Sequence, residues 1–242
     1  MNLPLPELPP ARAGRARLLA LLPCAGLGSR AGTAGPKQYH PLAGQPMVAH
    51  TLSSLAQVGF DAALVVLAPG DTGVGVPLPP GFFQQDCGGA TRADSVLNGL
   101  EALALAGADA NDWVLVHDAA RCLIEPAAID RLIDACLGDA VGGLLALPLP
   151  DTLKASVAGR VSATVDRSDK WLAQTPQMFR LGPLIEALQA RRAEGFAGIT
   201  DEASAMEQAG HRPLLVPGPA RNIKITYPED FALAEAVLRS RT

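Results

Sequence analysis

The residues with the clearest capacity for chemistry are two cations in a glycine-rich loop. Arg30 and Lys37 follow a short apolar run at residues 18–22, in a segment that reads LLALLPCAGLGSRAGTAGPK. No acidic residue occurs between Glu7 and Asp61, so the loop carries only positive charge. Glycines let backbone N–H groups approach a ligand, and oriented N–H groups beside cations favour an anion. The loop is predicted to bind an anion, and we expect a nucleoside triphosphate.

Two familiar phosphate-binding loops do not fit this segment. A G-x-G-x-x-A motif at residues 26–31 matches the loose dinucleotide fingerprint, but residues 46–50 contain no acid that could bind a ribose. Lys37 is followed by Gln38, where a Walker A loop needs Ser or Thr. The remaining alternative is an ordinary connection with solvated charges, although loops of this length are uncommon unless they are functional.

A carboxylate is expected to lie near the loop. Asp118 follows an apolar run at residues 113–116, and open α/β sheets bind ligands beyond the carboxyl ends of their strands. A carboxylate suits Mg²⁺, which keeps several waters and shares phosphate oxygens. The alternative is that Asp118 accepts backbone N–H groups in the next turn. The neighbouring His117 is interpreted as structural.

Apolar runs and helical spacing alternate along the first three-fifths of the chain. Strands are predicted at residues 18–22, 62–68, 82–86, 113–116 and 141–147. Helices are predicted at residues 46–58, 96–103 and 126–136. This order predicts an α/β fold of the Rossmann-like kind, with a mostly parallel twisted sheet and helices on both faces.

The pattern changes after residue 150. Two short polar runs, 152–157 and 161–165, flank Ala158-Gly159-Arg160 and predict a projecting β-hairpin arm at about 151–170. Such an exposed hairpin often packs on a second subunit. Further strands are predicted at 174–179, 214–216 and 223–226, and further helices at 184–193 and 200–209. A capping box of Thr226 and Glu229 is predicted to open the last helix.

Composition limits the class of protein. The chain has 242 residues, of which 48% are hydrophobic, so we expect a single domain over 17–242 after a disordered tail over 1–16. The net charge of −4 and the 4% aromatic content argue against a nucleic-acid partner. No apolar stretch reaches the ~20 residues of a membrane span. The four cysteines form no CxxC pair and indicate free thiols, hence a cytoplasmic location.

Several short motifs together carry a family resemblance. PCAGLGSRAGTAGPKQY is followed by GGATRADSV, HDAAR, DTLK, VDRSDKWLAQTPQMF, TDEASAME and NIKIT. In this order, over residues 18–238, they closely resemble 2-C-methyl-D-erythritol 4-phosphate cytidylyltransferase of the non-mevalonate isoprenoid pathway. The resemblance implies transfer of a cytidylyl group from CTP to a polyol phosphate, with release of pyrophosphate and a requirement for Mg²⁺ or another divalent cation.

The resemblance also implies roles for individual residues. Arg30 and Lys37 match the residues that stabilise the transition state, with Lys224 and Arg167 as further catalytic cations. Nucleotide contacts are implied at Cys24, Ala25, Gly26, Gly28, Gly89, Arg92, Ser95, Ala119 and Thr175. Contacts with the polyol phosphate are implied at Asp118, Arg121, Thr152, Arg167, Thr200 and Lys224. Asp118 is also implied to lie near the metal.

The arm is implied to join a homodimer and to bring Arg167 to the neighbouring subunit's site. Without the resemblance, Arg167 would be interpreted as part of a solvated turn and Thr200 as a helix cap. The chain departs from the family at Ala90, where many relatives carry an acid.

Three alternatives stay open at this point. An enzyme with the same fold and chemistry could use ribitol 5-phosphate or another polyol phosphate as its acceptor. A nicotinamide-dependent oxidoreductase is disfavoured by the missing ribose-binding acid. A catalytically silent nucleotide-binding module is disfavoured by the joint presence of Arg30, Lys37, Asp118 and Lys224.

Overall fold

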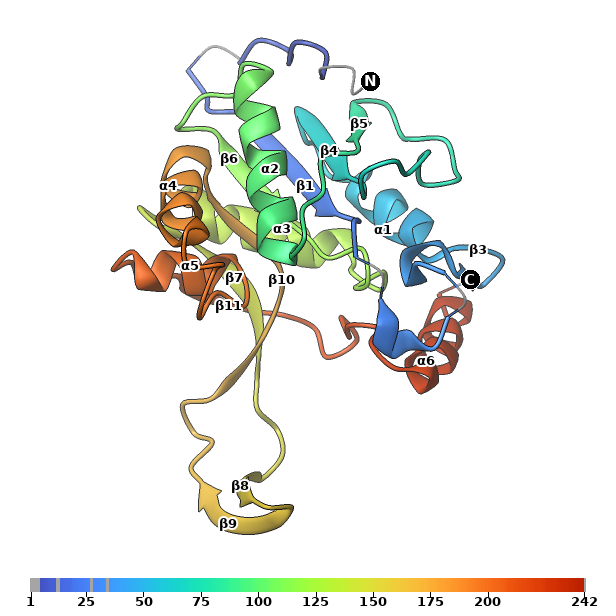
Figure 1. Cartoon of the computed structure of the whole chain (residues 1–242), viewed down its shortest axis with the longest axis vertical. Helices are drawn as coiled ribbons and strands as arrows, with labels where there is room; N and C mark the ends of the chain where they lie inside the picture. Colours follow the sequence, from blue (N-terminus) through green and yellow to red (C-terminus); the bar gives the residue numbers. More distant parts are fainter. Residues whose placement is uncertain (1–4, 12–13, 27, 34, 242) are drawn as a thin grey trace.

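A computed structural model describes residues 5–11, 14–26, 28–33 and 35–241. Its central sheet has seven strands in the order β11-β7-β10-β6-β1-β4-β5 (Figure 1). They span Leu18–Pro23 (β1), Ala62–Val66 (β4), Phe82–Gln85 (β5), Trp113–Val116 (β6), Gly142–Pro148 (β7), Trp171–Arg180 (β10) and Leu214–Pro217 (β11). β10 is antiparallel to both of its neighbours, and the other pairs are parallel. The predicted mostly parallel α/β sheet is confirmed.

Helices cover both faces of the sheet. They span Met47–Leu55 (α1), Arg92–Leu105 (α2), Pro126–Leu137 (α3), Leu181–Arg192 (α4), Glu202–Gln208 (α5) and Pro228–Arg239 (α6). Leu19 and Leu21 of β1 pack in one core with α2, α4 and α5, while Leu18 and Leu22 pack in the other with α1 and α3. Alternate residues of a strand point to opposite faces, so β1 is apolar throughout because both of its faces are covered.

The carboxyl ends of β1 and β6 lie side by side at the point where the strand order reverses. From β1 the chain runs outward through β4 and β5, then returns to place β6 on the other side of β1. Open α/β sheets bind ligands at such a point, because the loops leaving the two strands diverge there. The glycine-rich loop leaves β1 at Pro23, and the segment containing Asp118 leaves β6 at Val116.

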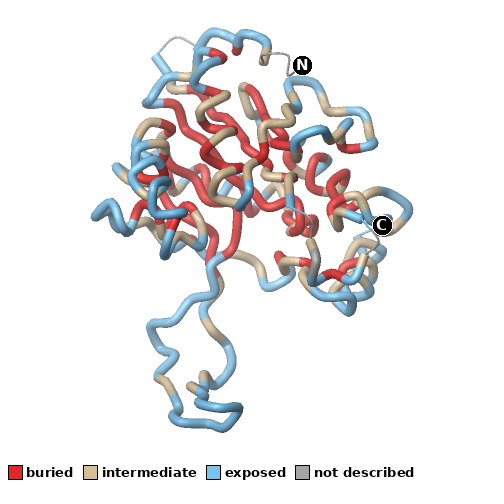
Figure 2. The backbone as a smooth tube through the Cα atoms, viewed as in Figure 1, coloured by how far each residue is buried: buried red, intermediate tan, exposed pale blue. Residues whose placement is uncertain are grey.

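The predicted hairpin is present as β8 (Leu153–Val157) and β9 (Arg160–Val165), which form their own two-stranded antiparallel sheet. It projects far from the central sheet (Figure 1), and its backbone is almost entirely exposed (Figure 2). Val157 and Val161 at its tip are 69% and 66% exposed. The arm therefore contributes little to the core of its own chain.

Short elements fill the region between β1 and α1. Two 3-10 helices, η1 (Ser29–Ala31) and η2 (Lys37–Tyr39), break up the glycine-rich loop, and the two-residue strands β2 (Pro41–Leu42) and β3 (Gln45–Pro46) form a small hairpin. None of these four elements was predicted from the sequence.

Two expectations for the C-terminal part are wrong. Residues 223–226 form no strand; they have no regular secondary structure, and the N–H of Ile225 donates to the carbonyl of Ala120 in the segment after β6. α6 is capped one residue later than predicted: Asp230, rather than Glu229, accepts the N–H groups of Thr226 and Tyr227. The cause is Pro228, which occupies the first helical position and keeps Tyr227 extended.

The expected disordered tail is also wrong in part. Leu8 is buried against α2, and its N–H donates to the carbonyl of Ala106. Residues 1–4 and 12–13 of that expected tail lie outside the described residues. Among the described helices, none combines the length and apolar character needed to cross a bilayer.

Candidate active site

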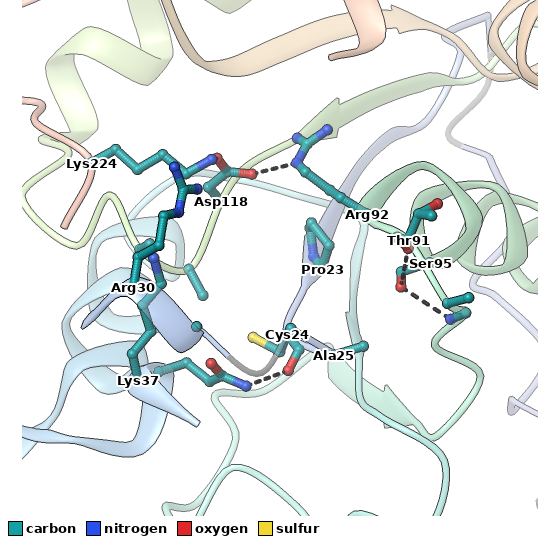
Figure 3. A pocket seen from close by; sticks show the side chains of 17 residues that line it. Pro23, Cys24, Ala25, Arg30, Lys37, Thr91, Arg92, Ser95, Asp118 and Lys224 are labelled. Atoms are coloured by element: carbon teal, nitrogen blue, oxygen red, sulfur yellow. Dashed lines mark hydrogen bonds and ion pairs between the residues drawn. The ribbon is translucent and has the colours of Figure 1, made fainter. Parts of the chain in front are cut away.

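A cavity of about 590 Å³ opens at the carboxyl ends of β1 and β6. Its lining comes from the glycine-rich loop, the turn before α2, the segment after β6 and the segment that contains Lys224 (Figure 3). The lining includes most of the predicted residues: Cys24, Ala25, Gly26, Gly28, Arg30, Lys37, Gly89, Arg92, Ser95, Asp118, Ala119 and Lys224. In Figure 3, Arg30, Lys37 and Lys224 lie on one side, and Arg92 and Ser95 lie on the other.

Backbone geometry fixes Lys37 in the loop. Gly28 has a φ of +65°, and a Cβ there would lie 2.6 Å from Cγ of Lys37. Glycine accepts this left-handed conformation at little cost and leaves the space that the lysine stem fills. Nζ of Lys37 donates to the carbonyl of Ile225 at 2.7 Å. Burial, followed by repulsion from Lys224, lowers the pKa of Lys37.

A second tight turn forms the opposite wall. A Cβ on Gly88 would lie 2.3 Å from Cβ of Ala25, so this turn can approach the glycine-rich loop only because a glycine stands there. Thr91 and Asp94 form a capping box that starts α2. The hydroxyl of Ser95 accepts the N–H of Gly89 at 3.0 Å and donates to the carbonyl of Thr91 at 2.9 Å. These bonds hold the turn before α2 in a fixed conformation at the wall of the cavity.

Asp118 joins two cations from different parts of the chain. Its Oδ1 accepts Nε of Arg92 at 2.8 Å, and its Oδ2 accepts Nζ of Lys224 at 2.6 Å. Burial alone would raise the pKa of Asp118, but the charges and hydrogen bonds of Arg92 and Lys224 hold that pKa well below its usual range. Asp118 is therefore an anion at any pH near neutrality.

The residues behind Asp118 form a buried polar layer. The hydroxyl of Thr175 accepts the backbone N–H of Asp118 at 3.0 Å and pairs with Nδ1 of His117 at 3.1 Å. Burial lowers the pKa of His117 to about 4, so its ring is neutral at pH 7. His117 does not line the cavity, in line with the structural interpretation made from the sequence.

Arg121 is directed away from the cavity in this arrangement. Its guanidinium donates to the carbonyls of Asn222 at 2.7 Å and Ala173 at 3.1 Å. These bonds join the segment after β6 to β10 and to the stretch that leads to Lys224. Arg121 thus ties together the backbone that carries Asp118 and Lys224.

Five predicted residues do not line the cavity. Thr175 and Arg121 lie behind it, as described above. Thr200 lines a neighbouring pocket of about 140 Å³ that also contains Arg92 and Glu202. Thr152 and Arg167 belong to the arm segment and line none of the cavities at the sheet within the described chain. Asp201, rather than Thr200, caps α5.

Sequence reasoning missed two residues that shape the site. Nε2 of Gln38 donates to the carbonyl of Cys24 at 2.6 Å and closes the loop on itself. Glu202, which is 1% exposed, forms a two-bond pair with Arg92. An acid at the start of α5 within the quoted TDEAS motif was the available signal, but its partner lies 110 positions away.

The cavity residues bear on two possible chemistries, namely nucleophilic attack by the Cys24 thiol and metal binding by Asp118. Burial raises the pKa of Cys24 to about 12, so its thiol is protonated and is a poor nucleophile. No group of three or more His, Cys, Asp or Glu side chains within the described ranges could hold a metal alone. Asp118 is the one carboxylate in the described cavity lining. A single ionised carboxylate fits Mg²⁺ that arrives with phosphate oxygens.

Comparison with known proteins supplies a family. The family described as 2-C-methyl-D-erythritol 4-phosphate cytidylyltransferase (IspD) matches residues 18–240. The protein of that name from Ralstonia nicotianae is 53% identical over 94% of this chain and 93% of its own length. The one from Chromobacterium violaceum is 54% identical over 93% of this chain and 99% of its own length.

A longer relative is more similar still. The bifunctional enzyme IspD/IspF of Albidiferax ferrireducens is 59% identical over 98% of this chain. The chain spans 56% of the length of that relative.

Solved structures agree with the sequence comparisons. A crystal structure of 4-diphosphocytidyl-2C-methyl-D-erythritol synthase is 41% identical, covers 93% of this chain and 99% of its own, and has a TM-score of 0.81. The Francisella tularensis 2-C-methyl-D-erythritol 4-phosphate cytidylyltransferase is 32% identical over 92% of this chain and all of its own, with a TM-score of 0.80. With the family match over residues 18–240, these relatives show that the chain belongs to the 2-C-methyl-D-erythritol 4-phosphate cytidylyltransferase family of enzymes.

Proposed function

We propose that this chain transfers the cytidylyl group of CTP to 2-C-methyl-D-erythritol 4-phosphate. The products are 4-diphosphocytidyl-2-C-methyl-D-erythritol and pyrophosphate. Family membership and the cation-lined cavity at the reversal of the strand order support this function. The observation that carries it is the meeting of Arg30, Lys37 and Lys224 around one carboxylate, Asp118, at that cavity.

The reaction forms one P–O bond and breaks another. An oxygen of the acceptor's phosphate attacks the α-phosphorus of CTP, and the bond between that phosphorus and the bridging oxygen breaks. The electron pair leaves with pyrophosphate. A phosphate monoester is already ionised near neutral pH, so its oxygen needs no general base. The protein must therefore bring two anions together and neutralise the charge that develops between them.

The cavity's cations suit that task. Arg30 can hold two phosphate oxygens through its planar guanidinium, and Lys37 supplies a positive charge on a stem that Gly28 and Ile225 hold in place. Lys224 binds the phosphate group of the acceptor. Mg²⁺ bound by phosphate oxygens and by Asp118 would neutralise further charge on the triphosphate.

Cytosine selection is assigned to backbone groups of the two facing turns. The glycine-rich loop and the turn before α2 approach closely at Ala25 and Gly88. Main-chain groups around Ala25 and Gly89 are therefore available to the base, and Ala90, which also lines the cavity, cannot supply a side-chain hydrogen bond. Backbone carbonyls can accept the exocyclic amine that distinguishes cytosine from uracil.

We also propose a homodimer in which the arms are exchanged. The exposed arm residues and the absence of Arg167 and Thr152 from the cavity lining of their own described chain support this arrangement. The free thiols of Cys24, Cys87, Cys122 and Cys136 support a cytoplasmic location, where thiols stay reduced.

The acceptor assay tests this function directly. Purified protein with CTP and Mg²⁺ is expected to release pyrophosphate when 2-C-methyl-D-erythritol 4-phosphate is added. Ribitol 5-phosphate is the matched control, because it offers the same attacking phosphate on an unbranched chain. Release with ribitol 5-phosphate alone would contradict the proposed acceptor but keep the chemistry. Release with neither acceptor would contradict both.

A further inference from the structure

Four charged side chains of alternating sign form a continuous line from α5 to the cavity. Glu202 accepts Nη1 and Nη2 of Arg92 at 2.7 Å and 3.0 Å. Nε of Arg92 reaches Oδ1 of Asp118 at 2.8 Å, and Oδ2 of Asp118 reaches Nζ of Lys224 at 2.6 Å. The four residues come from α5, the start of α2, the segment after β6 and the segment between β11 and α6.

Glu202 lies at the buried end of this line. Its side chain is 2% exposed, and it does not line the cavity of about 590 Å³. Within the described part of the chain, Arg92 is its hydrogen-bonding partner. A buried carboxylate is costly unless it is paired and hydrogen-bonded. The location of this charge therefore depends on Arg92.

The ion pair with Glu202 determines which groups the guanidinium of Arg92 can contact. A guanidinium presents a fork of two Nη groups and a separate Nε–H. Glu202 binds both Nη groups, so that only Nε is left to donate to Asp118. The two Nη groups are then not available to bind phosphate oxygens. Arg92 is thereby held by carboxylates at both ends, although its side chain lines the cavity and is 27% exposed. An arginine free of Glu202 would turn its fork toward Asp118.

The orientation of Asp118 follows from the same geometry. Because Arg92 binds Oδ1 from one direction, Oδ2 is directed toward Lys224. Losing the Glu202 pair would let Arg92 turn its fork onto Asp118 and rotate the carboxylate plane, so that Lys224 would lose its fixed partner. A displacement of about 1 Å in a positioning group can lower a rate by about 10²-fold.

We propose that Glu202 is a positioning residue that acts through Arg92 and Asp118 to hold Lys224 in place for the acceptor's phosphate. This inference rests on the proposed function, and it assigns Arg92 to holding Asp118 rather than to binding the nucleotide. A purely structural role for Glu202, as an acid at the start of α5, predicts lower stability without a selective kinetic effect.

The test compares variants with whichever acceptor the wild-type enzyme turns over, so its failure is distinct from failure of the proposed acceptor. Glu202→Gln keeps the shape of the side chain and removes its charge. We expect kcat/KM for the acceptor to fall at least about tenfold. The Kd for CTP, measured by calorimetry, should stay within about twofold of wild type, because the cations of the glycine-rich loop are untouched.

Asp112→Asn is the matched control. Asp112 forms a comparably buried pair with Arg17, at 2.8 Å, at the amino ends of β6 and β1, opposite the carboxyl ends where the cavity opens. This substitution should lower the melting temperature and leave kcat/KM for both substrates unchanged. Equal loss of kinetic efficiency in Asp112→Asn and Glu202→Gln would show that the effect is one of general destabilisation, and would overturn the proposal.

A double-mutant cycle shows whether Glu202 acts through Arg92. In an Arg92→Met background, Glu202→Gln should cause no further loss of kcat/KM, whereas an undiminished loss would overturn the proposal. If Glu202→Gln alone fails to fold, the double variant tests the proposal instead, because it removes both charges of the buried pair and leaves neither one unpaired. The double variant should keep its affinity for CTP and lose acceptor kcat/KM. Wild-type kinetics in the double variant would also overturn the proposal.

Discussion

Gly28 and Lys37 are in such close contact that a Cβ on Gly28 would lie 2.6 Å from Cγ of Lys37. The two residues are nine positions apart, yet the glycine determines where the lysine stem can pass. At least one glycine of the loop therefore has a steric role, because it leaves the space through which the stem of Lys37 passes.

Gly28→Ala is expected to lower kcat by at least about tenfold. The new methyl group would displace Lys37, and alanine in a left-handed conformation costs roughly 1–2 kcal/mol. Gly44→Ala separates the two effects, since Gly44 also has a positive φ, of +83°, but has open space at its Cβ position. Steady-state kinetics and melting curves should show similar destabilisation in both variants and a loss of kcat in Gly28→Ala alone. A parallel loss of kcat in Gly44→Ala would refute the steric argument.

Lys37→Ala is expected to lower kcat far more than it weakens CTP binding. Removing a comparable transition-state donor lowers a rate by roughly 10²–10³-fold. Arg131→Ala is a suitable control, because Arg131 is an exposed cation that donates to the carbonyl of Pro217, away from the cavity. Kinetics together with calorimetric titration of CTP distinguish the two effects. Equal losses in kcat and in CTP affinity would mean that Lys37 binds the ground state and the transition state alike.

Arg167→Ala and Lys37→Ala subunits are expected to complement each other when mixed. If the arm serves the neighbouring site, each mixed dimer contains one site with both residues intact. A statistical mixture should then recover about a quarter of wild-type activity, since about half of its dimers are mixed and each has one good site of two.

A mixture of Lys37→Ala with Asp118→Asn controls for the exchange itself. Both residues line the same cavity of one chain, so neither site of a mixed dimer is intact and no recovery is expected. The complementation is measured as pyrophosphate release after unfolding and refolding the subunits together. Recovery in the control mixture, or none in the test mixture, would argue against exchanged arms.

The stability of the fold is expected to fall in mildly acidic solution because of His117. Its pKa drops from the ordinary 6.5 to about 4 on burial. Between those values the unfolded chain binds more protons than the folded one, so the free energy of unfolding decreases as the pH falls from about 6.5 toward 4. The contribution is about 2 kcal/mol at a pH near 4.5 relative to neutrality.

His117→Gln should flatten this dependence, because glutamine does not titrate. Urea unfolding at several pH values measures the slope for the wild type and for the variant. An identical slope in wild type and His117→Gln would show that another group causes the acid sensitivity.

The sequence predicted the part of the fold that depends on local pattern. Five strands of the central sheet in the first three-fifths were found, four of them because they are short apolar runs, and the position of Asp118 beyond β6 follows from the strand's end. The insertion of β10 between β6 and β7 could not be predicted in the same way, since strand order depends on long-range pairing rather than on periodicity.

The site was predictable where neighbouring residues in the sequence form it. Arg30 and Lys37 were identified from their glycine-rich surroundings alone. Lys224 was identified only through the family resemblance. Nothing in its local sequence shows that the neighbouring Ile225 would bond to Ala120 and so bring Lys224 to the cavity. Glu202 was missed for the same physical reason: a buried pair between residues far apart in the chain leaves no periodic signal.

The attachment of the segment around Ile225 has a consequence for the protein during its synthesis. When translation has passed the end of β11 at Pro217, every strand of the central sheet exists. Nζ of Lys37 still lacks the carbonyl of Ile225, and Asp118 still lacks Lys224. Since domains can begin to fold while the ribosome is still elongating the chain, the sheet can form before the proposed catalytic centre does. A chain terminated there would lack both contacts, and enzymatic competence would report on synthesis of the C-terminal segment.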